Sequence, residues 1–488
     1  MKYIYKRRFF GFLTFSLILL CLGMVSCEQN DSENPVTDLS AIKSDYTATS
    51  GETLCGTLSS NIKISVADGA TVTLKGVTIG GETGENWKWA GLTCLGDATL
   101  ILEDTNSVTA FYEGYSGIYV PENKTLTIKG TGSLTATGQE YGAGIGNGDY
   151  TSCGNIVISG GSITAVGGYG ASGIGGGEAC EDEAYENPTC GDITIEGGTV
   201  VAYGGYGASG IGAGFATMCG NIRINGGSIT AVGGNGGSGI GGGTQTNLTE
   251  STITISGGSV TAVGGEYASG LGSGWIGNWG DILIEGGIIS ASAGLDSVGI
   301  GCGYAPSSCG DITISGGYVM ARGNNEGAAI GSGRQSLNGC GDITISGGTV
   351  IAEGGSQGGS GIGTSDYSCC KNIKISGGSV TASGGFYAAG IGTGPNGSFK
   401  SILISGGEVR ASGGMSAAGI GTGAETSCEG TITITSGVTS LSAEKGSGGD
   451  EVQCIGSGKD GSCGTVTIGG VEGAITESPY TYSPGADG

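Results

Sequence analysis

The side chains that could do chemistry recur at fixed places in a repeated segment. An acidic or amide residue stands just before an isoleucine in seven of the segments, and Asp281, Asp311 and Asp342 do so in three consecutive ones. If the segments stack at the usual spacing of β-strands, these carboxylates stand about 4.8 Å apart. Like charges so close repel, and a hard cation bound through oxygen relieves the repulsion. The pattern is consistent with a Ca²⁺ site, or with side chains that close turns by bonding their own backbone.

Aromatic side chains collect in the variable turns of the same segments. Flat rings that are spaced along a rigid surface suit the apolar faces of sugar rings, because such rings are amphipathic. The predicted carbohydrate-binding residues are Trp87, Trp89, Tyr169, Tyr206, Tyr267, Trp275, Trp279, Tyr304 and Tyr387. The alternative is that the tyrosines only cover exposed glycine corners.

The 16 cysteines favour structural roles. Histidine is absent and no CxxC pair exists, which leaves a four-cysteine site as the one usual structural zinc site still open. Cys180 and Cys190 bracket an inserted acidic loop and predict a disulfide clip, with stacked free thiols as the alternative. The position three residues before the marker isoleucine indicates an apolar stacked corner, with a disulfide between neighbours possible. It holds Cys153, Cys190, Cys219, Cys309, Cys340 and Cys370, and elsewhere Trp279 and Phe399.

A segment of about 30 residues recurs from residue 153 onward. Its first isoleucine returns every 29 to 31 residues, with one spacing of 37 where the acidic loop is inserted. Each segment holds three short runs, for example 193–195, 200–202 and 210–212, separated by glycine or polar turns. Runs this short, with alternating aliphatic residues, predict strands and exclude helices.

No single segment can bury its own isoleucines, whereas stacked segments bury them against one another and pair every strand amide. We therefore predict an all-β protein, a single-stranded right-handed parallel β-helix of about 14 coils of about 30 residues. More divergent segments near residues 70, 98 and 124 extend it toward the N-terminus. The predicted solenoid covers residues 51–488, with an N-terminal cap.

The N-terminus predicts export. A basic head is followed by an apolar run over residues 9–25, which is typical of a signal peptide, with a membrane anchor as the alternative. The run ends in Ser26-Cys27 and resembles a bacterial lipobox, although Met24 stands where leucine is usual. We therefore expect residues 1–26 to be a signal peptide, Cys27 to be lipidated and residues 27–50 to be an acidic tether. The resemblance implies an outer-membrane lipoprotein that faces outward at the cell surface.

The repeats resemble bacterial carbohydrate-binding parallel β-helix proteins. The similarity covers about residues 51–488 and is carried by units such as Gly-Asp-Ile-Thr-Ile-Ser-Gly-Gly at 341–348. It implies a fold like that of pectate lyases and an extracellular, calcium-associated binder of plant-type polysaccharide. No ligand-binding motif of that family can be matched residue by residue.

Charge and composition narrow the function. The net charge of −24 disfavours nucleic acid and anionic membrane as partners. We expect a polysaccharide or a host or cell-surface glycan as partner, with membrane contact only through the lipid anchor. Lyases of this architecture use Arg or Lys beside calcium and hydrolases use grouped carboxylates, but here the arginines are scattered. We therefore expect a binder and no enzyme; the alternatives are a structural adhesin or stalk, and a polysaccharide lyase or hydrolase.

Overall fold

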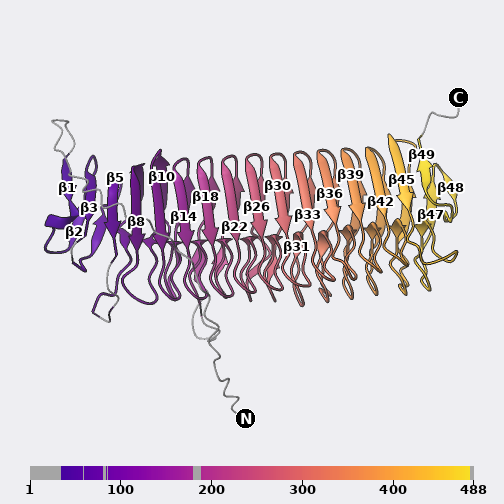
Figure 1. Cartoon of the computed structure of the whole chain (residues 1–488), viewed down its shortest axis with the longest axis horizontal. Helices are drawn as coiled ribbons and strands as arrows, with labels where there is room; N and C mark the ends of the chain where they lie inside the picture. Colours follow the sequence, from indigo (N-terminus) through magenta and orange to yellow (C-terminus); the bar gives the residue numbers. More distant parts are fainter. Residues whose placement is uncertain (1–34, 59, 81–83, 85, 180–187, 484–488) are drawn as a thin grey trace, which may run out of the picture.

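The chain forms a rod-shaped parallel β-solenoid (Figure 1). The computed structural model describes residues 35–58, 60–80, 84, 86–179 and 188–483. The solenoid has about 13 turns of about 29 residues each, which confirms the predicted fold class. No helix among the described residues is long and apolar enough to cross a membrane.

Each turn contributes three strands, which pair in register with those of the next turn. In one turn these are β17 (Ile193–Ile195), β18 (Thr199–Tyr203) and β19 (Ile211–Gly212). They pair in parallel with β21 (Ile222–Ile224), β22 (Ser228–Val232) and β23 (Ile240–Gly241). The rows of first and second strands form one sheet, and the third strands form a 15-stranded sheet of their own.

The core is a column of aliphatic side chains inside the rod. Alternate residues point inward, so Ile193 and Ile195 are fully buried while Thr194 between them is half-buried. Each inward isoleucine lies on its counterpart in the next turn, as in the pair Ile193 and Ile222. Stacking therefore supplies the burial that no single segment could achieve.

Glycine occupies one fixed position in the third strands of the later turns because the backbone of the next turn passes too close for a side chain. Gly212 has a φ of +129°, and a Cβ placed on it would lie 2.2 Å from the carbonyl oxygen of Gly241. The same position is glycine in each of these strands from β12 (Ile145–Gly146) onward, and in the two three-residue strands one further residue follows the glycine. The row of glycines lets the third strands turn sharply at one edge of the rod.

The solenoid starts earlier than predicted. β1 (Val36–Asp38) pairs with β3 (Thr53–Thr57), and β2 (Tyr46–Ala48) pairs with β4 (Ile64–Val66). The prediction of a tether up to residue 50 is therefore wrong from residue 36 onward, because these polar residues satisfy their backbone by pairing with the first full turn. The predicted signal peptide and Cys27 lie outside the described residues.

The C-terminal end is closed by antiparallel pairing. β48 (Val471–Glu472) folds back on β47 (Val466–Ile468), and β49 (Tyr480–Tyr482) pairs with β45 (Ser440–Glu444). These reversed strands occupy the edge that a further turn would otherwise fill. They thereby cover backbone groups that could pair with another chain.

Candidate functional site

The sequence of the repeats varies most along one edge of the rod, where two loops of each solenoid turn lie side by side. One loop follows the second strand and the other follows the third strand; we call the row of these loops the variable edge. Backbone hydrogen bonds join them, since the N–H groups of Asp149, Trp275 and Tyr304 donate to the carbonyls of Gly114, Gly236 and Tyr267. Side chains from successive turns are thus set in a row at the spacing of the strands.

The variable edge contains a cavity of about 560 Å³ near the N-terminal end. It is built on three stacked third strands: β6 (Leu92–Cys94), β9 (Ile118–Tyr119) and β12. Its volume lies in the range of small-molecule binding sites. The lining side chains include Lys63, Lys88, Trp89, Thr93, Tyr112, Glu113, Tyr115, Ser116, Tyr119, Asp149 and Thr151.

Tyr119 marks the turn that departs from the repeat. It stands opposite Gly146, in the place that glycine fills in the later turns. Burial raises the pKa of this half-buried phenol, with Cys153 and Glu122 adding to the effect. The Tyr119 side chain thus stands at a position where later turns have no side chain, and its ring lines the cavity.

Aromatic rings and unpartnered polar groups share the cavity wall. The rings of Tyr112 and Tyr115 lie 6.5 Å apart, and the Lys88 ammonium lies 5.3 Å from the Tyr112 ring centroid. The indole Nε1 of Trp89 and the hydroxyl of Ser116 are buried without a hydrogen-bond partner. A ligand that has both apolar faces and hydroxyl groups would satisfy this set.

Two carboxyl groups, one lining the cavity and one in the next turn, have raised pKa values. Burial and the neighbouring Glu113 raise the pKa of Asp149 to about 6. In the next turn, burial, Asp149 and Glu140 raise the pKa of Glu178 to about 7. Since no ion pair between these groups and a cation is present among the described residues, they protonate near neutral pH.

A second group of variable side chains lies farther along the same edge. The centroid of the Tyr267 ring lies 5.8 Å from the ring centroid of Trp275 and 5.2 Å from the ring centroid of Tyr304. The Tyr304 hydroxyl forms a hydrogen bond of 3.1 Å with Oε1 of Gln335. All three aromatic residues are half-buried, so each presents part of a ring to solvent.

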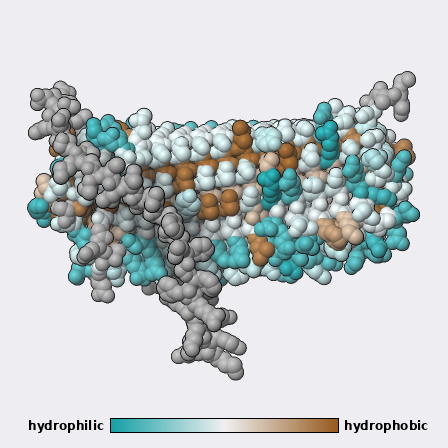
Figure 2. Space-filling model, in the orientation of Figure 1, coloured by the Kyte–Doolittle hydropathy of each residue, from teal (hydrophilic) through white to brown (hydrophobic). Residues whose placement is uncertain are grey.

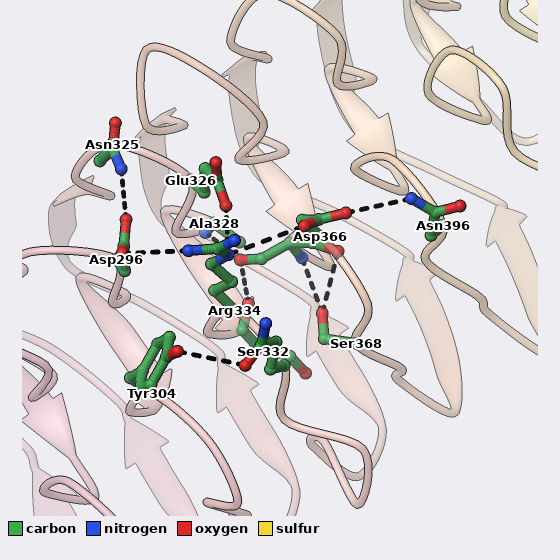
Figure 3. Close-up of polar contacts among 12 residues, drawn as sticks. Asp296, Tyr304, Asn325, Glu326, Ala328, Ser332, Arg334, Asp366, Ser368 and Asn396 are labelled. Atoms are coloured by element: carbon green, nitrogen blue, oxygen red, sulfur yellow. Dashed lines mark hydrogen bonds and ion pairs between the residues drawn. The ribbon is translucent and has the colours of Figure 1, made fainter.

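Arg334 follows this aromatic group and is surrounded by acids from successive turns (Figure 3). Its Nη1 lies 3.5 Å from Asp296 Oδ2 and its Nε lies 3.7 Å from Asp366 Oδ2. Nε also forms an ion pair with Glu326, in a geometry that makes no hydrogen bond. Burial alone would lower the pKa of Arg334, but the carboxylates raise it. The guanidinium therefore stays charged and ties three turns together.

Apart from Trp279, the predicted aromatic residues fall into four environments. Trp89 lines the cavity, and Tyr267, Trp275 and Tyr304 form the second group. Tyr169 and Tyr206 are exposed and stack in parallel at 5.2 Å, and Tyr387 is exposed beside Phe386. Trp87 is half-buried and packs against the core.

Trp279 was wrongly predicted as a binding residue. Only 1% of its surface is exposed, because it replaces Leu248 of the preceding turn in the buried corner. The sequence already indicated this burial, since the position of Trp279 in the repeat holds cysteine in other turns. Trp279 therefore contributes to the core and cannot meet a ligand.

The three aspartates Asp281, Asp311 and Asp342 bond to the backbone. Oδ1 of Asp281 accepts from the Asp311 N–H at 2.8 Å, and Oδ1 of Asp311 accepts from the Asp342 N–H at 2.8 Å. Asp342 accepts from Asn372 and pairs with Lys374. Within the described ranges, no group of three or more carboxylate, cysteine or histidine side chains is placed to hold a metal ion. The side chains of Asp281 and Asp311 thus bond the backbone of the following turn, and not their own backbone as the turn-closing alternative assumed. The Ca²⁺ site stays a prediction.

The predicted clip between Cys180 and Cys190 lies partly outside the described residues and stays a prediction. Cys190 is a free thiol that is fully buried in the corner column, and Cys180 lies outside the described residues. Cys190 shares its position with Cys153 and Cys219 in the adjacent turns. Its side chain points to those neighbours because the repeat fixes its direction.

The comparisons with known proteins agree with this architecture. A family model described as Beta helix repeat matches nine segments: residues 126–149, 156–178, 193–215, 222–244, 253–275, 312–334, 343–366, 373–395 and 402–424. The chain is a beta-helix repeat protein. Searches of curated proteins and of solved structures found no match. The matched repeats run from each first strand to the variable edge, so they describe the scaffold that presents the side chains.

Sequence reasoning missed most of the cavity. Tyr112, Glu113, Tyr115, Tyr119 and Asp149 were not predicted as site residues, although all of them line it. Four of the five precede the first matched segment, in turns whose sequence diverges from the repeat. The useful signal was the replacement of the third-strand glycine by Tyr119 in this beta-helix repeat protein.

Proposed function

We propose that this protein binds carbohydrate at the cavity of the variable edge and catalyses no reaction. The observation that carries the proposal is the cavity of about 560 Å³ whose wall combines Trp89, Tyr112, Tyr115 and Tyr119 with polar groups. Aromatic faces suit the apolar faces of sugar rings, and the polar groups suit sugar hydroxyls.

A polysaccharide is the favoured partner because the variable edge continues beyond the cavity. Tyr169 and Tyr206, and then the group of Tyr267, Trp275 and Tyr304, come from later turns along the same rod. A chain of sugars that lies parallel to the rod axis could meet these rings in succession. The face drawn in Figure 2 is mostly neutral to hydrophilic, with short rows of hydrophobic residues along the rod, as expected for a surface in contact with water.

The proposed location is the outer face of a bacterial outer membrane, with Cys27 as the lipid attachment site. The support is the N-terminal sequence: a basic head, an apolar run and Ser26-Cys27. Net charge supports neutral glycans over anionic ones and over nucleic acid, because the chain carries 43 acidic and 19 basic residues.

The experiment is a glycan array followed by calorimetry on each glycan that binds. Tyr112→Ala should weaken binding about tenfold, since one aromatic contact contributes about 1 kcal/mol or more. Tyr318→Ala is the matched control, because Tyr318 is an exposed tyrosine on a second strand of a distant turn and was not predicted to bind carbohydrate. If no glycan binds, or if both variants bind as the parent does, carbohydrate binding at this cavity is rejected.

The same samples test the absence of catalysis. Each bound glycan is incubated with the protein, and reducing ends and unsaturated products are measured over time. Product formation that disappears in Asp149→Asn would show an enzyme that uses the cavity acids in place of a binder.

A further inference from the structure

Three cysteine side chains form a ladder inside the corner of the solenoid. Cys190 in β16 (Thr189–Cys190) stands directly opposite Cys219 in β20 (Met218–Cys219). On its other side, Cys153 donates its N–H to Thr189 and accepts from the N–H of Gly191, which places it opposite Cys190. Three successive turns thus place a thiol at one register position.

Adjacent thiols of the ladder contact each other, and all three thiols are shielded from water. Their exposed fractions are 3%, 0% and 3% for Cys153, Cys190 and Cys219. A hydrogen bond with the Cys153 thiol raises the pKa of Cys190, and a hydrogen bond with Cys190 raises the pKa of Cys219. The side chains therefore approach each other in sequence along the ladder.

We propose that oxidation joins Cys190 to one of its two neighbours, Cys153 or Cys219, and leaves the third thiol reduced. Paired parallel strands lie about 4.8 Å apart, within the Cα separation of about 4.4–6.8 Å that a disulfide needs. Cys153 and Cys219 are two turns apart, or about 9.6 Å, which no disulfide spans. Cys190 is therefore the shared partner, and the ladder holds one disulfide at a time.

The step balances with a small-molecule disulfide as oxidant. The Cys190 thiolate attacks one sulfur of that disulfide, forms a mixed disulfide and releases one small thiolate. The thiolate of Cys153 or Cys219 then attacks the Cys190 sulfur and releases the second small thiolate. Two protein thiols are oxidised, one small disulfide is reduced to two thiols, and two protons leave the protein thiols.

Because the three thiols are buried in the folded protein, the disulfide forms before folding is complete or during local opening. Because the folded ladder excludes solvent, the oxidant meets these thiols while the turns assemble or open locally. The resulting bond joins turns that are 29 or 37 residues apart in the chain. It would restrict the unfolded chain and stabilise the stack at the point where the acidic loop interrupts the repeat.

A second ladder has the same pattern with an extra thiol. Cys340 and Cys370 face each other across a parallel bridge, and the free Cys309 thiol forms hydrogen bonds with the thiols of Cys302 and Cys340. More pairings are open there, so the ladder around Cys190 gives the cleaner test.

The test refolds the full chain with oxidised and reduced glutathione, blocks free thiols under denaturing conditions and maps the peptides by mass spectrometry. Cleavage at acidic residues separates the three cysteines, since Glu178 and Asp192 lie between them. We expect peptides that join Cys190 to Cys153 or to Cys219. Complete alkylation of all three thiols, or a link from Cys153 to Cys219, would overturn the proposal.

Serine variants supply a matched set. Cys190→Ser should abolish the disulfide, whereas Cys153→Ser and Cys219→Ser should each keep one, because an adjacent pair remains. The rise in melting temperature on oxidation should be about 4 °C larger in the parent, Cys153→Ser and Cys219→Ser than in Cys190→Ser, because the second ladder is common to all four proteins. Equal differences in all four proteins contradict the assignment. If a variant fails to fold, the peptide map of the parent still decides.

Discussion

Trp275 and Trp279 lie four residues apart, and the solenoid places them in opposite environments. Trp275 is half-buried in the variable edge beside Tyr267, whereas Trp279 is 1% exposed in the corner column. The indole Nε1 of Trp279 has no hydrogen-bond partner. Position in the repeat therefore decides whether an aromatic side chain supports the core or faces a ligand.

Replacing these two tryptophans should separate stability from binding. Trp279→Ala leaves a large cavity and should lower the free energy of unfolding by about 3–5 kcal/mol. Trp279→Leu should cost less, because Leu248 fills the same position in the preceding turn and leaves no unpartnered N–H. Trp275→Ala should change stability little. Urea unfolding measures all three, and equal losses for Trp275→Ala and Trp279→Ala would contradict the burial argument.

The acids at the cavity should make stability depend on pH. Asp149 and Glu178 have folded-state pKa values of about 6 and about 7, above their ordinary values near 4. At these two groups the folded state therefore binds more protons than the unfolded state, so their contribution to stability is fully present below about pH 4 and is lost as pH rises through about 6 and 7. The melting temperature of the parent should decline between pH 5 and 8.

The double variant Asp149→Asn, Glu178→Gln should flatten that decline. Glu285→Gln removes one exposed acidic side chain elsewhere and should leave the slope unchanged. A double variant whose melting temperature follows the same slope as the parent would show that these two carboxyl groups do not cause it.

At the scale of the strands, glycine sets the shape of the third row. Gly241 has a φ of +129°, and a Cβ there would lie 2.1 Å from the carbonyl oxygen of Gly272. The spacing of isoleucines and glycines was enough to predict the three rows of strands. It could not predict the cavity, because that site depends on which residue fills a turn, as Tyr119 does, and not on the period.

Gly241→Ala should damage the stack. The substitution adds backbone strain and a clash with the next turn, at a combined cost of about 3 kcal/mol or more. Gly197→Ala is the control, because its Cβ would be 3.4 Å from the nearest atom and its φ is ordinary. Thermal unfolding followed by circular dichroism compares the two, and similar melting temperatures would refute the steric account.

At the scale of the whole rod, the ends were the least predictable parts. The tether was predicted to run to residue 50, yet β1 and β2 already pair with the first full turn. The polar residues of this segment carry no isoleucine period, so only the backbone pairing reveals them. The antiparallel closure by β48 and β49 likewise leaves no mark in the repeat.

A solenoid whose turns contact only their neighbours should tolerate the loss of one complete turn. Deleting residues 222–252 removes the turn that begins with β21 and brings β17 against β25 (Ile253–Ile255), with isoleucine again facing isoleucine. This variant should fold, melt a few degrees lower and bind glycan as the parent does, since the cavity is lined by residues 63–151. Deleting residues 222–236 removes half a turn, breaks the register of all later strands and should prevent folding. Circular dichroism and calorimetry on the two deletions decide the matter: if the full-turn deletion is also unfolded, the turns do not act as independent, stackable units.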